Sequence, residues 1–253
     1  MPYSCLILPL HKVFTMHRNI ILTEDGSHTL RVTELDECYH STHGAVQESD
    51  HIFVKSALRE FLSVCADDFH ESGFSKDAVV DERRVIRVLE IGFGTGLNAF
   101  LTMLEAERLN LRIYYTALEL YPLPADEALL LNYPEALCGD RALFEKMHFS
   151  SWGEDYNVTS FFTLNKIKAD FTGYELQGLF DVIYFDAFSP EKQPEMWLES
   201  GFCKIYEHSD NGAVMTTYCA KGAVRRAMQS AGFVMERLPG PPGKREILRA
   251  RKG

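Results

Sequence analysis

From about residue 84 to the C-terminus, apolar runs typical of β-strands alternate with stretches that have the periodicity of helices. The runs RVIRVLEI, RIYYTALEL, FFTLNKIKAD, LFDVIYFDA and GAVMTTYC predict strands, and segments such as LNAFLTMLEAERL and AKGAVRRAMQSAG predict the helices between them. Helical crossovers make successive strands parallel and cover both faces of their sheet. The stretch therefore predicts an α/β domain with a doubly wound, mostly parallel sheet.

Further elements complete this pattern. We predict helices at residues 124–133 and 194–209, and a closing pair of strands at 233–238 and 245–251. The N-terminal part has a different rhythm, because residues 19–32 form two β-type runs around Asp25-Gly26 and predict a hairpin. A helix is expected at 44–66 and a loop at 67–83. We therefore divide the chain into a ragged N-terminus (1–18), a hairpin-and-helix extension (19–83) and the main α/β domain (84–253).

Composition is that of a globular protein, with 46% hydrophobic and 25% charged residues. The start MPYSCLILPLHKVFTMHRN has no basic region before its apolar patch and no small-residue cleavage site, so we predict no signal peptide and no membrane association. Met16 is an alternative start, because the recognisable pattern begins just after it. The six cysteines form no C-x-x-C pair, which favours reduced thiols and a cytoplasmic location. Cys38, His40 and His43 lack a fourth ligand at a convincing spacing, so no metal site is predicted.

A glycine-rich loop follows the first strand of the main domain, in VLEIGFGTGLNAF. Gly92, Gly94 and Gly96 allow a ligand to approach the backbone, but the dinucleotide pattern G-x-G-x-x-G needs glycine where Leu97 stands. Glu90, just before the loop, is unfavourable for a pyrophosphate. The loop therefore suits a cationic ligand without phosphates, such as S-adenosylmethionine, although a glycine turn with no ligand is the alternative.

Acidic residues end all four central strands, at Glu90, Glu119, Asp170 and Asp186. The carboxyl ends of parallel strands lie on one rim of the sheet, where α/β proteins bind ligands. Glu119 is placed to bind both ribose hydroxyls, and Asp170 to accept from an adenine amino group. One such acid is often only a cap for the next helix, but four together with the glycine loop predict a nucleoside site.

Three segments resemble one family: LEIGFGTGLNAF, YFDAFSPEKQPEMW and AKGAVRRAMQSAGFVMERLPGPPGKREIL. They are similar to the tRNA 5-methylaminomethyl-2-thiouridine methyltransferases, which include free-standing MnmD and the methyltransferase half of bifunctional MnmC. The likeness spans about residues 19–250. It implies a Rossmann-like class I methyltransferase fold and methyl transfer from S-adenosylmethionine to the primary amine of 5-aminomethyl(-2-thio)uridine at the tRNA wobble position. Bifunctional members continue into a flavin-dependent oxidase, so the resemblance assigns any oxidase step to a separate protein.

The resemblance also implies roles for individual residues. Cofactor contacts are expected at Glu90, Gly92, Gly94, Gly96, Glu119 and Asp170, and Tyr39, Ser41 and Glu48 are expected beside the cofactor as substrate-binding candidates. Asp186 is expected at the reacting centre, where a carboxylate could bind the substrate ammonium and receive its proton. The alternative is that Asp186 caps the turn that follows it.

Charge is distributed unevenly along the chain, whose net charge is −10. Residues 212–253 carry +7 and leave −17 for residues 1–211. This basic end is either a solvated helix face or a phosphate-binding edge. With a tRNA substrate, Lys221, Lys244 and Arg245 become candidate contacts to the phosphates of the anticodon stem-loop, the last two held outward by the loop PGPPG.

Three alternatives from other classes follow from the same features. An aminopropyltransferase acting on a small amine shares the sheet, the glycine loop and an acidic pocket, but has no use for the basic tail. A non-catalytic tRNA-binding module would tolerate a broken cofactor site, whereas every expected acid is intact here. A nicotinamide oxidoreductase is disfavoured by Leu97.

Overall fold

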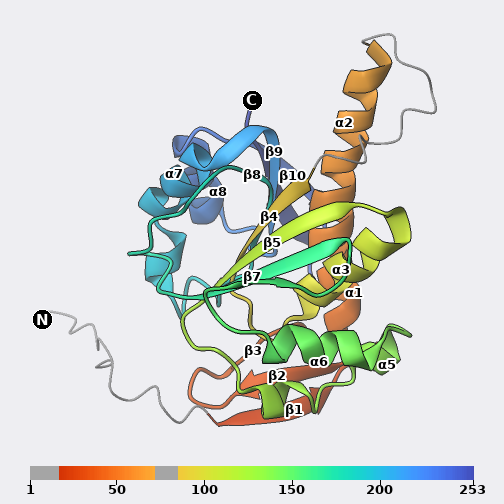
Figure 1. Ribbon diagram of the computed structural model, residues 1–253. Helices are drawn as coiled ribbons and strands as arrows, with labels where there is room; N and C mark the ends of the chain where they lie inside the picture. Colours follow the sequence, from red (N-terminus) through yellow and green to blue (C-terminus); the bar gives the residue numbers. More distant parts are fainter. Residues whose placement is uncertain (1–16, 72–84) are drawn as a thin grey trace, which may run out of the picture.

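The computed structural model describes residues 17–71 and 85–253, and for residues 66–71 it describes the backbone alone. Figure 1 shows a central twisted sheet with helices on both sides and a small sheet at one end. The central sheet has eight strands in the order β10-β11-β9-β8-β4-β5-β7-β6. Its strands are β4 (Val85–Ile91), β5 (Arg112–Glu119), β6 (Asp155–Asn157), β7 (Phe162–Lys168), β8 (Phe180–Phe185), β9 (Ser209–Thr217), β10 (Val234–Pro239) and β11 (Glu246–Arg251).

The strand pairing confirms the predicted doubly wound sheet. Strand β4 lies parallel to both β5 and β8, β7 is parallel to β5, and β9 is parallel to β8. Only β6, β10 and β11, toward the edges, pair in the antiparallel sense. The chain builds outward from β4 first through β5 and β7, and then in the other direction through β8 and β9. A crevice is expected between β4 and β8, where the direction of winding reverses.

Alternate residues of the central strands pack into two hydrophobic layers. On β4, Val88 belongs to the layer beneath one group of helices and Leu89 to the layer beneath the other. The first group comprises α3 (Leu97–Leu109) and the long helix formed by α1 (Ala45–Ser49), the π-helical segment η2 (Asp50–Leu58) and α2 (Arg59–Glu71). The second group comprises α7 (Glu199–Glu207) and α8 (Gly222–Ser230).

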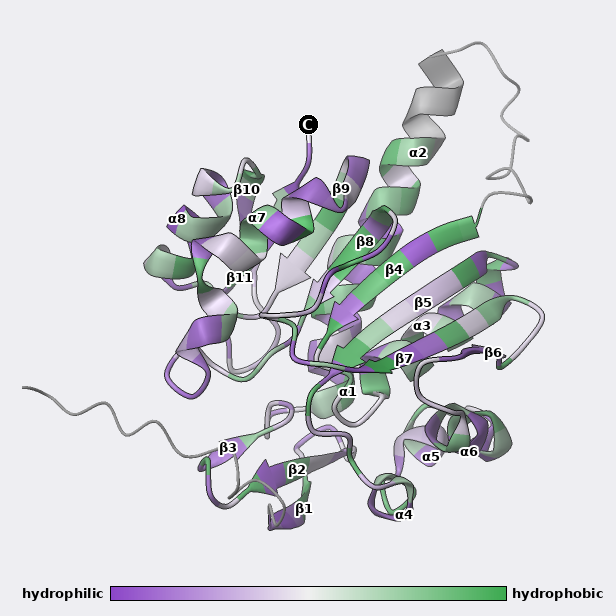
Figure 2. Ribbon diagram, turned by 60° about the vertical axis from the view of Figure 1, so that its left-hand side comes forward, coloured by the Kyte–Doolittle hydropathy of each residue, from purple (hydrophilic) through white to green (hydrophobic). Residues whose placement is uncertain are grey.

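The predicted N-terminal hairpin is confirmed as β1 (Arg18–Leu22) and β2 (His28–Val32), joined through a turn at Asp25 and Gly26. A third strand that we did not predict, β3 (Glu37–Cys38), pairs with β2. Figure 2 shows the arrowheads of β4, β5 and β7 pointing toward this small sheet. The N-terminal extension therefore lies beside the carboxyl ends of the central strands.

Several helix predictions were wrong in detail. The segment predicted as one helix at 124–133 forms only the short helix α4 (Ala125–Ala128), after which the chain turns. A separate short helix, α5 (Tyr133–Ala136), then begins with Pro134 in its first turn, where no amide hydrogen is needed. The helix predicted at 194–209 is divided at Leu198, which is extended between the 3₁₀ turn η3 (Pro194–Trp197) and α7.

Two further elements differ from the sequence prediction. We did not predict helix α6 (Arg141–Phe149), although Asp140 caps it by accepting from the amide of Ala142 at 2.8 Å. Residues 67–71 were expected in a loop, but they belong to α2, which continues to Glu71. Residues 1–16 and 72–84, which contain the predicted ragged start and the rest of that loop, lie outside the described residues. No helix in the described part of the chain is long and apolar enough to cross a membrane.

Candidate active site

A cavity of about 750 Å³ lies at the carboxyl ends of the central strands, where the crevice was expected. Segments that follow β4, β5, β7 and β8 form its floor, at residues 91–95, 118–121, 169–171 and 186–188. The rest of its wall comes from residues 37–42 around β3, from Glu48 on α1, from 192–196, and from Tyr218 and Lys244. The cavity therefore combines the α/β domain with the N-terminal extension.

The glycine loop after β4 lies in close contact with Asp186 and Tyr39, two other residues of the cavity wall. Gly92 has φ 96°, and a Cβ atom there would lie 2.6 Å from the carbonyl oxygen of Asp186. Gly94 has φ 51°, and its Cβ would lie 2.9 Å from the ring of Tyr39. Both positions therefore require glycine. Gly96, also predicted as a cofactor contact, does not line the cavity but precedes the first residue of α3.

Glu119 and Asp170 both line the cavity. Glu119 accepts hydrogen bonds from the amides of Gly94 at 3.0 Å and Tyr121 at 2.8 Å, which fix its carboxylate at the end of β5. Each of its oxygens keeps a further lone pair for a ligand. Burial raises the pKa of Glu119 despite these bonds. One oxygen of exposed Asp170 accepts from the amide and the hydroxyl of Thr172, both at 2.8 Å.

Glu90 lies behind the cavity and not in its wall, which differs from the predicted cofactor contact. Its position on β4 points it toward α3, where it is completely buried and accepts from the Asn98 amide at 2.9 Å. Burial raises the pKa of Glu90 well above its usual value, so its neutral form is favoured. Glu90 therefore supports the site from beneath.

Asp186 occupies the floor of the cavity next to the glycine loop. Its carboxylate accepts from the same Asn98 amide group, at 2.8 Å, and no other hydrogen bond to its side chain is present among the described residues. This contact is not a cap of the following turn. The pKa of Asp186 is raised to about 7, chiefly by burial and also by the charge of Glu48, whereas the hydrogen bond from Asn98 and the charge of Lys244 lower it. Asp186 can therefore change its protonation state near neutral pH.

Sequence reasoning missed Asn98, which joins Glu90 and Asp186. Its side chain is buried on α3, with 2% of its surface exposed. A signal was present, because an amide stands one residue into the otherwise apolar start of a helix that follows a glycine loop. A buried amide of this kind needs hydrogen-bond partners.

The three candidates in the N-terminal extension all line the cavity. Tyr39 packs edge-on against Phe188 with 5.1 Å between ring centroids. The amide of Ser41 donates to Glu48 at 2.6 Å, and the Glu48 side chain is buried. Nearby His40 is bonded to the hydroxyl of Thr95 at 2.8 Å, and burial lowers its pKa to about 4. His40 is therefore uncharged at neutral pH.

Of the three basic candidates only Lys244 lines the cavity, and it points inward, so the prediction that it is held outward was wrong. Its ammonium lies 3.3 Å from a carboxylate oxygen of Glu48 and 4.7 Å from the ring centroid of Tyr218. The buried carboxylate of Glu48 attracts the ammonium group of Lys244 into the site. Arg245 is exposed, and Lys221 is paired on the surface with Glu191.

The chemistry of the wall fits S-adenosylmethionine. The side chains that line the cavity include more carboxylates than cations. The carboxylates are Glu37, Glu48, Glu119, Asp170, Asp186 and Glu195, and the cations are Lys192 and Lys244. This excess of negative charge suits a sulfonium and an ammonium, while the ring of Tyr39 and other aromatic groups offer surfaces to a base. Among the residues that the structure describes, no group of three His, Cys, Asp or Glu side chains is arranged to hold a metal ion.

Comparisons with known proteins agree with this geometry. Residues 158–253 match a family described as S-adenosyl-L-methionine-dependent methyltransferase. The bifunctional protein MnmC (tRNA 5-methylaminomethyl-2-thiouridine biosynthesis) of Pseudomonas savastanoi pv. phaseolicola is 31% identical over 247 residues, which cover 93% of this chain and 34% of that protein. MnmC of Leptospira interrogans is 25% identical over 226 residues, covering 85% of this chain and 32% of the relative. The chain thus spans about a third of the length of these curated relatives.

Solved structures extend the comparison. A crystal structure of MNMC2 from Aquifex aeolicus superposes with a TM-score of 0.69 at 26% identity, covering 94% of this chain and 71% of that one. Spermidine synthase from Thermotoga maritima has a TM-score of 0.54 at 14% identity over 94% of this chain and 74% of that one, which shows a shared fold alone. Over 93% of its length the chain is thus similar to about a third of MnmC, and its residues 158–253 match the S-adenosyl-L-methionine-dependent methyltransferase family.

Proposed function

We propose that this chain methylates the primary amine of 5-aminomethyl(-2-thio)uridine at the wobble position of tRNA, forming 5-methylaminomethyl-(2-thio)uridine. The observation that carries the proposal is the position of Asp186. Asp186 lines an acidic cavity beside Gly92 of the glycine loop, and its carboxylate is influenced by the charges of Glu48 and Lys244, which line the same cavity. A carboxylate in this place can bind an amine and remove its proton.

The cofactor would be held by the ends of the first three central strands. Gly92 and Gly94 let it approach the backbone, Glu119 accepts from ribose hydroxyls, and Asp170 borders the adenine. When bound, S-adenosylmethionine supplies an electrophilic methyl group, whose carbon–sulfur bond breaks with its electron pair left on sulfur as the nitrogen–carbon bond forms. The relatives' printed names, which state tRNA 5-methylaminomethyl-2-thiouridine biosynthesis, support this choice of reaction.

Asp186 prepares the amine for attack. The substrate enters as an alkylammonium, whose nitrogen has no lone pair until a proton leaves. The carboxylate of Asp186 accepts that proton, directly or through water, and orients the nitrogen, while the amide of Asn98 fixes the carboxylate from below. A pKa of about 7 suits this task, because Asp186 is then ionised in enough molecules to act and can still hold a proton.

The tRNA would approach over the exposed residues at the mouth of the cavity. Lys192 lines the mouth and is exposed, and Arg245 and Lys221 lie on the surface of neighbouring loops. We assign these three residues to phosphate contacts with the anticodon stem-loop. We also assign the step that exposes the amine, by removal of a carboxymethyl group, to a separate flavin-dependent oxidase in the cytoplasm.

Nucleoside analysis of tRNA tests the proposal. Purified chain, S-adenosylmethionine and tRNA that carries 5-aminomethyluridine should yield 5-methylaminomethyluridine, whereas tRNA with the carboxymethylaminomethyl group should stay unchanged. Putrescine with decarboxylated S-adenosylmethionine is the matched test of the aminopropyltransferase alternative. Formation of spermidine together with unmodified tRNA would overturn the proposal.

A further inference from the structure

The side chain of Lys244 places a positive charge inside the site of a reaction that consumes an amine. Its ammonium is held on one side by Glu48 at 3.3 Å and on another by the ring of Tyr218 at 4.7 Å. Only 29% of the Lys244 side chain and 8% of the Glu48 side chain are exposed. The charge of Lys244 also acts on Asp186, whose pKa it lowers. A lysine that served only tRNA phosphates would not need these contacts.

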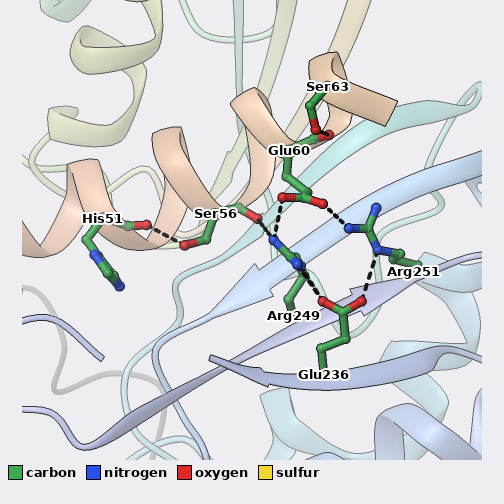
Figure 3. Close-up of polar contacts among 7 residues, drawn as sticks. All are labelled: His51, Ser56, Glu60, Ser63, Glu236, Arg249 and Arg251. Atoms are coloured by element: carbon green, nitrogen blue, oxygen red, sulfur yellow. Dashed lines mark hydrogen bonds and ion pairs between the residues drawn. The ribbon is translucent and has the colours of Figure 1, made fainter. Parts of the chain in front are cut away.

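Contacts elsewhere in the fold keep Lys244 in this place. Lys244 lies in the turn between β10 and β11, and Glu48 lies on the helix that begins with α1. Figure 3 shows four charged side chains that join this helix to the hairpin: Glu60, Glu236, Arg249 and Arg251. His51 adds a bond of 2.8 Å to the carbonyl oxygen of Pro239, close to the turn. The hairpin is thus fixed to the helix on both sides of Lys244.

The titratable groups around Lys244 show on which charges it acts. The titratable groups that surround it are Glu48 from α1, Asp186 after β8, and Tyr218 and Cys219 after β9, with Glu90 of β4 behind Asp186. Burial keeps the Tyr218 hydroxyl, the Cys219 thiol and Glu90 in their neutral forms, because it raises the pKa of each. Of the six carboxylates that line the cavity, Glu48 and Asp186 are therefore the two on which the charge of Lys244 is seen to act.

A cation inside the cavity lowers the pKa of an amine bound near it, and Lys244 also lowers the pKa of Asp186. In a partly dry cavity, a substrate ammonium would be disfavoured by repulsion from the ammonium of Lys244. Without Lys244, the amine would keep its proton to higher pH and would remain unreactive there. We propose, on the basis of the proposed function, that the positive charge of Lys244 favours the anionic form of Asp186 and the neutral form of the substrate amine. Lys244 would act through these groups and would not itself take part in the reaction.

The first test measures Asp186 without turnover. The carboxyl carbon of Asp186 is titrated by NMR in the free protein and assigned with the Asp186→Asn variant. The Lys244→Met variant should raise the titration midpoint by about one pH unit, the lower end of the effect of a nearby opposite charge, because Lys244 and Asp186 line the same cavity. Lys244→Arg should restore the original midpoint, and the exposed neighbour change Arg245→Met should leave it in place. An unchanged midpoint in Lys244→Met would overturn the inference.

The second test follows methyl transfer under single-turnover conditions from pH 6 to pH 10, with saturating tRNA and S-adenosylmethionine. Lys244→Met should move the rising limb of the rate to higher pH by about one unit or more, because the midpoints of both Asp186 and the amine increase. In separate steady-state assays with varied tRNA, Arg245→Met should raise the KM for tRNA, and it should not move that limb. A Lys244→Met enzyme that shows only a raised KM would make Lys244 a phosphate contact and overturn the inference.

These outcomes are distinct from a failure of the proposed function. If the wild-type chain does not methylate 5-aminomethyluridine, the proposed function fails, while the NMR midpoint still reports whether Lys244 controls the charge of Asp186. Thermal unfolding and calorimetry with S-adenosylhomocysteine show that each variant is folded and binds the cofactor product. If Lys244→Met is unfolded, Lys244→Gln is used, because its amide can donate to Glu48 without a charge.

Discussion

All seven of the residues to which the proposed function assigns cofactor or amine contacts line one cavity, and they divide into a proposed cofactor half, formed by Gly92, Gly94, Glu119 and Asp170, and a proposed amine half, formed by Glu48, Asp186 and Lys244. The cofactor half is built from neighbouring strand ends and the turns that follow them. By contrast, Glu48 and Lys244 come from the N-terminal helix and the C-terminal hairpin and meet only through the tertiary fold. Changes in the cofactor half should therefore act on cofactor binding, whereas the amine half should respond to changes in distant elements as well.

The largest effect is expected from Asp186→Asn, which keeps the size of the side chain but removes the anion. Because asparagine can accept no proton, kcat should fall about 10²–10⁴-fold, the range typical of losing a positioned general base. Affinity for S-adenosylmethionine, measured by calorimetry, should change less than about tenfold, the equivalent of roughly 1.4 kcal/mol. Normal turnover by this variant would show that Asp186 is not the general base, and the proposed amine half would then have no catalytic role.

The difference in thermal stability between Asp186→Asn and the wild-type protein should depend on pH in a defined direction. The folded-state pKa of Asp186 is raised to about 7 from an ordinary value of 3.8, so the folded protein binds the extra proton between these values. The resulting stabilisation is present below about pH 4 and is lost as the pH rises through 7. Asp186→Asn should therefore have a higher Tm than wild type at pH 8, and this advantage should disappear at pH 4. A Tm difference that is independent of pH would contradict the shifted pKa.

In the cofactor half, Glu119→Ala should weaken binding of S-adenosylmethionine by about 1–3 kcal/mol, the cost of lost hydrogen bonds to a ligand and of unpaired partners. The amides of Gly94 and Tyr121 lose their acceptor in this variant. Calorimetry measures the effect, and Glu119→Gln, which can still accept, is the matched control. An equal rise in the KM for tRNA would mean that the two halves are not separable.

A smaller effect is expected from Glu60→Gln, which weakens the ion pairs that fix the hairpin to the helix. Glu60 pairs with Arg249 at 2.8 Å and also with Arg251. We expect a loss of about 1 kcal/mol in the free energy of unfolding by urea, with cofactor affinity preserved. Glu246→Gln, in the more exposed pair with Arg237, is the control and should cost about 0.3 kcal/mol.

The smallest effect concerns a single exposed charge. Arg245→Met should raise the KM for tRNA about threefold and reduce the slope of log affinity against log salt by about one, as expected for one lost phosphate contact. Cofactor affinity should not change. If the salt dependence of tRNA binding is unaltered, Arg245 makes no phosphate contact and is only a solvated surface residue.

Much of the fold followed from local patterns. Except for the short strands β3 and β6, the strands, the α3 helix and the N-terminal hairpin were predicted because alternating or continuous apolar runs identify them without knowledge of their neighbours. Helix α6 was missed and the segment 124–133 was predicted as one helix, because short helices depend more on caps and packing than on periodicity. The π-helical segment within the long helix also has no periodic signal that would separate it from an α-helix.

The sequence by itself indicated where β4, β5 and β8 end, because the apolar runs of β4 and β8 meet Gly92 and Asp186, and that of β5 ends on Glu119. It indicated one group of site residues, of which all but Glu90 and Gly96 line the cavity: Glu90, Gly92, Gly94, Gly96, Glu119, Asp170 and Asp186. Tertiary structure alone decided which way side chains point. Glu90 faces α3 and not the cavity, since successive residues of a strand face opposite sides of the sheet. Lys244 turns inward because a buried carboxylate from a distant helix lies within reach, and no local pattern encodes that contact.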